Sequence, residues 1–114
     1  MNYFPITINN ESSFSITNTG TAPTPCKLTI IPKIDILTLT ITGLSAEPIV
    51  LRNIYYNSVV IIDGETGLFT INDVANYNNY DAWEFPKLQP GINNITITNA
   101  SQCEISIEFE PRYI

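Results

Sequence analysis

Side chains that could take part in chemistry gather in one stretch of this chain, from Asp73 to Phe85, with the sequence DVANYNNYDAWEF. Asp73, Asp81 and Glu84 lie within it, and paired carboxylates are the working groups of glycoside hydrolases. Loop carboxylates are usually solvated, however, and a small domain can hardly build the deep cleft that a glycosidase needs. The chain contains no histidine, which excludes Ser-His and Cys-His triads, and it has no glycine-rich phosphate loop. We therefore expect no enzyme activity, no catalytic residues and no cofactor.

The same stretch carries Tyr77, Tyr80 and Trp83, followed by Phe85, among amides and carboxylates. On one interpretation it is a sugar platform, in which the rings pack on pyranose faces while Asn and Asp bond the hydroxyls. The interpretation we favour makes Trp83 and Phe85 core residues that cover one edge of the domain, with the segment from Tyr77 to Asp81 more exposed. A third is contact with another protein, since Tyr and Trp are enriched at interfaces. The candidate contact residues, for a glycan or a protein, are Tyr77, Asn78, Asn79, Tyr80, Asp81 and Trp83.

The two cysteines, Cys26 and Cys103, each open an apolar-alternating run. We expect both to be small buried hydrophobic residues with free thiols, although a bridge between them is the alternative if the fold brings their Cβ atoms together. Two distant cysteines without histidine do not supply the four ligands of a zinc site. The sequence therefore predicts no metal site.

The charge of the chain excludes two classes of partner. Its net charge is −6 and its 5 basic residues are scattered, whereas binding to nucleic acid or to an anionic membrane needs clustered Lys and Arg. No apolar run approaches the roughly 18 residues of a membrane span, and residues 1–5 do not begin a secretory signal. We expect no nucleic acid, no membrane insertion and no signal peptide.

Alternation of apolar and polar residues with period two predicts β-strands. From Cys103 to Phe109 the odd-numbered residues are apolar, and from Glu104 to Glu110 the even-numbered ones are polar, so Ile105, Ile107 and Phe109 are expected in the core and Glu104 and Glu108 in solvent. Leu37, Leu39 and Ile41 alternate with threonines in the same way. Further runs lie at residues 13–17, 27–31, 49–54, 58–63, 68–72 and 95–98. Eight short strands predict an all-β fold, a two-sheet antiparallel β-sandwich of the jelly-roll kind.

Turn residues separate these runs and set the domain limits. The sequence Asp63–Gly67 (DGETG) predicts a hairpin loop, and Pro90-Gly91 suits the central positions of a type II turn. The proline-rich stretch 20–25 suits a passage from one sheet to the other. Residues 1–12 show no clear strand pattern, and we interpret them as a linker or N-terminal extension before a sandwich domain of residues 13–114.

Several short motifs follow one another in a fixed order: Asn18–Pro25 (NTGTAPTP), Val60–Gly67 (VIIDGETG), Asn76, Trp83–Ile95 (WEFPKLQPGINNI) and Pro111–Ile114 (PRYI). Each motif is weak alone, but their order and spacing form a fairly specific set that runs over nearly the whole chain. Together they resemble the C-terminal domain of siphophage distal tail proteins, components of phage and prophage tails.

This resemblance implies a galectin-like or carbohydrate-module-like β-sandwich. In the family, the parent protein forms a ring at the tail tip between the tail tube and the host-binding baseplate, and this domain lies outside the ring. The implied location is the virion tail, after synthesis in the bacterial cytoplasm without a signal peptide. The implied partners are other tail and baseplate proteins, with host surface polysaccharide as a further partner. The ring-forming N-terminal domain of the family is not in this chain, so an oligomer is expected of the full-length parent and a monomer of this domain alone.

Two functions from different classes follow from these observations. The first is a structural component of a phage or prophage tail tip that supports assembly and host adhesion. The second is a carbohydrate-binding module that recognises a host cell-surface glycan. No sugar-binding residue is implied by the resemblance, because its motifs consist of turn residues such as Pro86 and packing residues such as Phe85 and Leu88.

Overall fold

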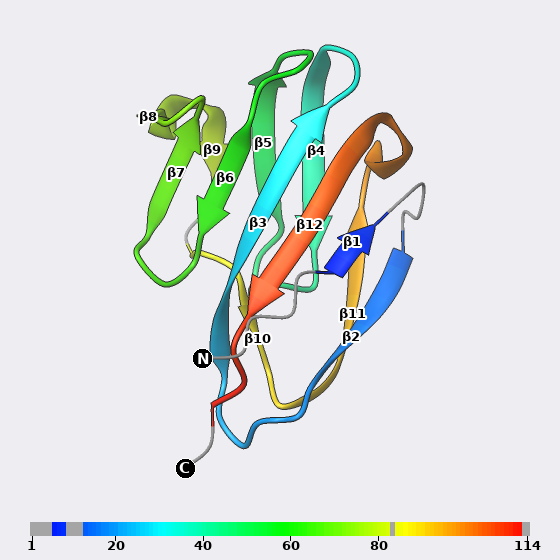
Figure 1. The fold of residues 1–114 in the computed structure, drawn as a ribbon, viewed down its shortest axis with the longest axis vertical. Coiled ribbons are helices and arrows are strands. Elements are labelled where there is room, and N and C mark those ends of the chain that lie inside the picture. The colour runs from blue at the N-terminus through cyan, green and yellow to red at the C-terminus, as the bar shows by residue number, and fades with distance from the viewer. Residues whose placement is uncertain (1–5, 9–12, 83, 113–114) are drawn as a thin grey trace.

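The computed structural model describes residues 6–8, 13–82 and 84–112, which form two antiparallel sheets packed face to face (Figure 1). The seven-stranded sheet has the order β1-β12-β3-β6-β7-β8, with β10 also paired to β3, and the five-stranded sheet has the order β2-β11-β4-β5-β9. No helix among the described residues is long and apolar enough to cross a membrane. The elements are β1 (Ile6–Ile8), β2 (Ser13–Asn18), β3 (Thr24–Pro32), β4 (Ile36–Thr42), β5 (Ile49–Ile54), β6 (Val60–Asp63), β7 (Leu68–Ile71), β8 (Val74–Ala75), the 3₁₀ turn η1 (Tyr77–Asn79), β9 (Tyr80–Asp81), β10 (Lys87–Leu88), β11 (Gly91–Ile97), the 3₁₀ turn η2 (Ala100–Gln102) and β12 (Cys103–Phe109).

The core lies between the sheets and is built from the alternating apolar residues. On β12 the side chains of Ile105, Ile107 and Phe109 are buried, Glu104 is exposed and Glu108 is half-buried. β3 pairs with β12 along its length and alternates in the same way, with every second residue buried. The predicted two-sheet β-sandwich and the register of its last strand are therefore confirmed, whereas the galectin-like relationship within this class stays a prediction.

The predicted alternation fails at Leu37, whose side chain is 80% exposed although Leu39 and Ile41 are buried. On the paired strand, Asn53 has a left-handed φ of 54°. Ile36 pairs with Ile54 and Thr38 with Arg52, while Leu37 and Asn53 between them face outward. The irregular backbone at Asn53 interrupts the period of two on both strands, so placing Leu37 on the core face was wrong.

The predicted turns are present. In the β6–β7 hairpin the Gly67 N–H donates to the Asp63 carbonyl at 2.9 Å, and Asp63 Oδ1 accepts from the Glu65 N–H at 3.0 Å. Gly91 has φ 93°, the sign that the second central position of a type II turn requires. The buried side chain of Asn93 closes this turn by accepting from the Gln89 N–H at 3.0 Å and donating to the Gln89 carbonyl at 2.9 Å.

Part of the predicted N-terminal extension forms a strand, since β1 pairs with β12 at the edge of the seven-stranded sheet. Ile6 lies opposite Ile107 and Ile8 opposite Ile105. Three residues of the segment 1–12 thus add to the sandwich, and the domain boundary at residue 13 stays a prediction.

Both cysteines are buried free thiols, as expected. Cys26 lies opposite Phe109 at one end of the β3–β12 ladder, and Cys103 lies opposite Pro32 at the other. Six residues of strand separate these positions on β3, which corresponds to about 20 Å at a strand rise of about 3.3 Å per residue. A disulfide needs a Cα separation below about 7 Å, so this register keeps the thiols apart. Burial raises the pKa of Cys26 to about 12 and that of Cys103 to about 11.

Candidate functional site

The aromatic segment, defined as residues 73–85, crosses between the two sheets (Figure 1). It leaves β7 through β8, which pairs with β7 in the seven-stranded sheet. After η1 it pairs with β5 in the five-stranded sheet as β9, and the chain then returns to the first sheet as β10. The segment is therefore held by backbone pairing to both sheets.

Tyr80 is a packing residue in this segment. Its ring stacks on Phe85 with centroids 4.9 Å apart and meets Phe69 at 5.2 Å, and its hydroxyl donates to the Glu84 carbonyl at 2.6 Å. Burial, with a smaller effect from the Cys26 thiol, raises the pKa of Tyr80. Tyr80 is half-buried, as is Phe85, so its ring is not a free surface within the portion expected to be more exposed, because it packs between Phe69 and Phe85.

Tyr77 is more exposed than Tyr80 and could contact a ligand. Its side chain is 49% exposed, and its hydroxyl donates to the Gly67 carbonyl at 3.0 Å. This bond fastens η1 to the β6–β7 hairpin and leaves part of the ring in solvent. Tyr77 and Tyr80 consequently have different environments, and the half-buried ring of Tyr80 does not extend the surface of Tyr77 into a two-ring sugar platform.

The polar residues of the segment divide between internal and solvent roles. Asn79 Nδ2 donates to the carbonyls of Arg52 at 2.7 Å and Asn53 at 3.2 Å, and it thereby satisfies the irregular part of β5. Asp81 pairs with Arg52, with Oδ2 and Nη2 3.0 Å apart and both side chains exposed. Asn78 is exposed, and its side chain has no hydrogen-bond partner among the described residues.

Of the candidate contact residues, Tyr77, Asn78 and Asp81 present groups to solvent, while Tyr80 and Asn79 are engaged within the fold. Trp83 lies outside the described residues. The structural role of Asn79 was missed from the sequence because it depends on the irregular backbone at Arg52 and Asn53 of β5, which is distant in sequence.

Each of the three carboxylates of the segment either has its own cationic partner or is exposed to solvent. Asp81 pairs with Arg52, Glu84 pairs with Lys87 at 3.5 Å, and Asp73 is exposed in the β7–β8 turn. Two of the three thus already have a cationic partner of their own. Within the described part of the chain, no group of three or more Asp, Glu, Cys or His side chains could hold a metal ion.

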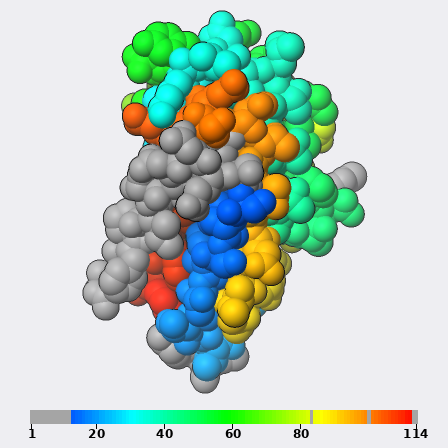
Figure 2. Space-filling view, turned by 90° about the vertical axis from the view of Figure 1, so that its right-hand side faces the viewer, coloured from blue at the N-terminus to red at the C-terminus, as the bar shows by residue number. Residues whose placement is uncertain are grey.

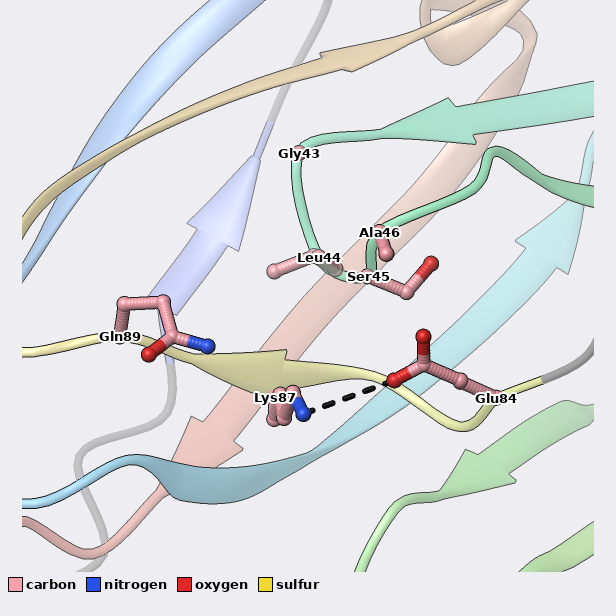
Figure 3. A pocket seen from close by; sticks show the side chains of 7 residues that line it. All are labelled: Gly43, Leu44, Ser45, Ala46, Glu84, Lys87 and Gln89. Atoms are coloured by element: carbon pink, nitrogen blue, oxygen red, sulfur yellow. Dashed lines mark ion pairs between the residues drawn. The ribbon is translucent and has the colours of Figure 1, made fainter.

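A shallow hollow of about 290 Å³ lies beside the segment, between the turn after β4 and the strand β10 (Figure 3). Its lining includes Leu44 and Ser45 from the turn, and the ion pair of Glu84 with Lys87 lies at its edge. The Lys87 N–H donates to the Leu44 carbonyl at 2.8 Å, which fixes the two walls relative to each other. One exposed ion pair and a turn backbone offer polar contacts to a partner, but they do not make an acid–base pair.

The chain matches the model of a protein family, and its fold is similar to that of a solved structure. Residues 19–113 match the family model described as siphovirus-type tail component, C-terminal domain. The solved structure of SPP1 Dit (gp 19.1), described as a paradigm of the hub adsorption apparatus in phages that infect Gram-positive bacteria, is similar with a TM-score of 0.74 at 9% identity. The match covers 96% of this chain and 46% of that one, so the chain spans less than half the length of this relative.

No curated protein matches the chain. At 9% identity the structural likeness shows the fold alone. The family match extends over most of the 114 residues and includes the hairpin Asp63–Gly67, the turn at Pro90-Gly91 and the strand β12. The chain therefore belongs to the siphovirus-type tail component family, in which it matches the C-terminal domain.

Proposed function

We propose that this domain is a structural component of a phage or prophage tail tip, where it supports assembly of the distal tail and adhesion to the host. The observation that carries the proposal is the family match over residues 19–113, together with the shared fold. On this proposal the protein acts by binding other proteins and catalyses no reaction. Its location is the virion tail, and its partners are other tail and baseplate proteins.

The outer face of the five-stranded sheet is suited to such contacts. Among the described residues of its strands, the charged side chains are Arg52 and Asp81, which pair with each other. Interface cores are depleted of charged residues, so this face can pack against a partner without burying an unpaired charge. The outward side chains of β2, β4 and β11 are Ser13, Ser15, Thr17, Leu37, Thr38, Thr40, Thr42, Ile92, Asn94 and Thr96.

A charge placed on this face tests the proposal. In particles that carry Thr96→Glu, we expect loss of tail assembly or of incorporation of the chain, because the new carboxylate would be buried without a partner. The control is Ser106→Glu on the outer face of the other sheet, where Glu104 and Glu108 already lie beside it. Equal and normal assembly of both variants would refute the assignment of this face.

The alternative is that the domain is a carbohydrate-binding module. The exposed part of Tyr77, the side chain of Asn78 and the carboxylate of Asp81 favour a contact at the aromatic segment. The internal roles of Tyr80 and Asn79 speak against the two-ring platform. Binding of a neutral glycan that is lost in Tyr77→Ala would support this alternative.

Deleting the coding sequence and restoring it from a plasmid tests the structural function directly. We expect the deletion to yield particles without complete tails and the plasmid to restore them. Normal infectious particles from the deletion strain would overturn the proposal.

A further inference from the structure

Large apolar side chains are exposed at one end of the sandwich, in the turns β3–β4 and β5–β6. Tyr55 and Tyr56 are 59% and 65% exposed. Figure 1 shows these turns at the upper end, and in Figure 2 they lie side by side at the top, in cyan and green. We name the exposed residues of this end the apical patch, which consists of Ile34, Leu37, Tyr55, Tyr56 and Val59.

The two tyrosines stand on a well-bonded turn. The Tyr56 N–H donates to Asp35 Oδ1 at 2.8 Å, and the Asn57 N–H donates to the Pro32 carbonyl at 2.9 Å. The Ser58 N–H donates to the Tyr55 carbonyl at 3.1 Å. The backbone beneath the rings is therefore fixed before any ligand arrives, and this lowers the entropic cost of binding.

At this end of the sandwich, asparagine and aspartate occupy backbone positions with positive φ, where glycine is the usual residue. The positive-φ glycines lie in turns toward the opposite end of the sandwich. The described non-glycine residues with positive φ all lie at the end that carries the apical patch: Asn53, Asn57, Asn72, Asp73 and Asn99. The side chains of Asn72 and Asn99 bond the backbone. Those of Asn53 and Asn57 have no hydrogen-bond partner among the described residues, and they flank the two tyrosines in sequence.

The apical patch lies at one end of the long axis of the sandwich. β12 begins at Cys103 near this end and descends to Phe109 toward the other end of a molecule 40 Å long.

We propose that the apical patch binds a neutral carbohydrate chain, with Tyr55 and Tyr56 packing on pyranose rings and the amides of Asn53 and Asn57 bonding hydroxyls. This inference rests on the proposed role in host adhesion and names its ligand class. Free amides both donate and accept, as sugar hydroxyls require. The β3–β4 turn contains one cation, Lys33, and one anion, Asp35, and the chain carries a net charge of −6, which opposes anionic polymers.

A printed array of neutral hexose and N-acetylhexosamine oligosaccharides tests the proposal with the 114-residue chain. We expect binding that falls about tenfold or more in Tyr55→Ala/Tyr56→Ala, since aromatic anchors dominate binding energy. Asn57→Gly keeps the left-handed backbone, removes the amide and should weaken binding less. Leu68→Ala, which alters a 46% exposed apolar residue in the β6–β7 hairpin, is the control and should bind normally. Absence of binding to every neutral glycan, binding to anionic glycans alone, or undiminished binding by the double variant would overturn the proposal.

Two controls separate this inference from the function on which it rests. Tyr55→Ala/Tyr56→Ala should keep the thermal midpoint of the native chain, because both altered side chains are mostly exposed. Particles carrying Tyr55→Ala/Tyr56→Ala should have complete tails but adsorb poorly to cells. Complete tails with normal adsorption would refute the glycan site and leave the structural function intact, whereas absence of the chain from wild-type particles would refute the structural function itself.

Discussion

Removing the ring of Tyr80 tests whether the aromatic segment is part of the core or a free ligand platform. Tyr80 packs between Phe69 and Phe85 and donates to the Glu84 carbonyl. Aromatic pairs contribute about 0.5–1.5 kcal/mol each, and a hydrogen bond contributes about 1 kcal/mol. Truncating a fully buried aromatic residue costs about 3–5 kcal/mol. Since Tyr80 is half-buried, we expect Tyr80→Ala to lower the free energy of unfolding by about 2–4 kcal/mol.

Two further variants divide this loss between the ring and the hydroxyl. Tyr80→Phe keeps both ring contacts and should cost about 1 kcal/mol, the value of the lost hydrogen bond. Tyr77→Ala removes a half-exposed ring with one hydrogen bond to Gly67 and should also cost about 1 kcal/mol or less. Urea unfolding followed by circular dichroism measures all three, with equal denaturant slopes as the sign that the folded states are comparable. A loss in Tyr80→Ala no larger than that in Tyr77→Ala would refute the packing role and restore the two-ring platform.

Three other features of the sandwich give direct tests. Ile107→Ala should lower the free energy of unfolding by about 2–5 kcal/mol because the side chain is fully buried. Glu104→Ala alters an exposed residue and should change it by about 0.5 kcal/mol or less. Equal losses in urea unfolding would show that the register of β12 is off by one residue. Gly64→Ala should prevent or weaken folding, because a Cβ there would lie 2.2 Å from a backbone carbonyl oxygen of the segment leading into β10; an unchanged thermal midpoint would contradict this packing. Burial raises the pKa of Cys26 to about 12 and of Cys103 to about 11, so the unfolded chain loses its thiol protons first. Stability should be complete below about pH 9 and fall as the pH rises toward the folded values, less steeply in Cys26→Ala; an alkaline loss of the same slope in that variant would exclude this thiol as a cause.

The fold was predictable where burial is decided by alternation within a strand. The residues of β12 alternate without interruption, and the structure buries Ile105 and Ile107 as that pattern requires. The turn at Pro90-Gly91 was also predictable, since only a residue that accepts a positive φ suits its second position. Leu37 was misplaced because the irregularity begins on the paired strand, at Asn53, and no local pattern on β4 reveals it.

The candidate site was less predictable because its residues are shared between two sheets. The amide of Asn79 and the ring of Tyr80 look free in the sequence, where both lie in a polar, asparagine-rich stretch. Their roles depend on β5 and on Phe69, which are distant in sequence and meet them only after the segment crosses the sandwich. The apical patch was missed for a related reason, since the β3–β4 and β5–β6 turns that carry Ile34 and Tyr55 meet only in the folded chain.

Immunogold electron microscopy of purified particles, with antibodies raised against the 114-residue chain, tests the central claim most directly. The proposed function predicts gold at the end of the tail farthest from the head, and no gold on particles from the deletion strain. Gold on the head or along the tail tube, or unlabelled particles from a lysate that contains the chain, would contradict it.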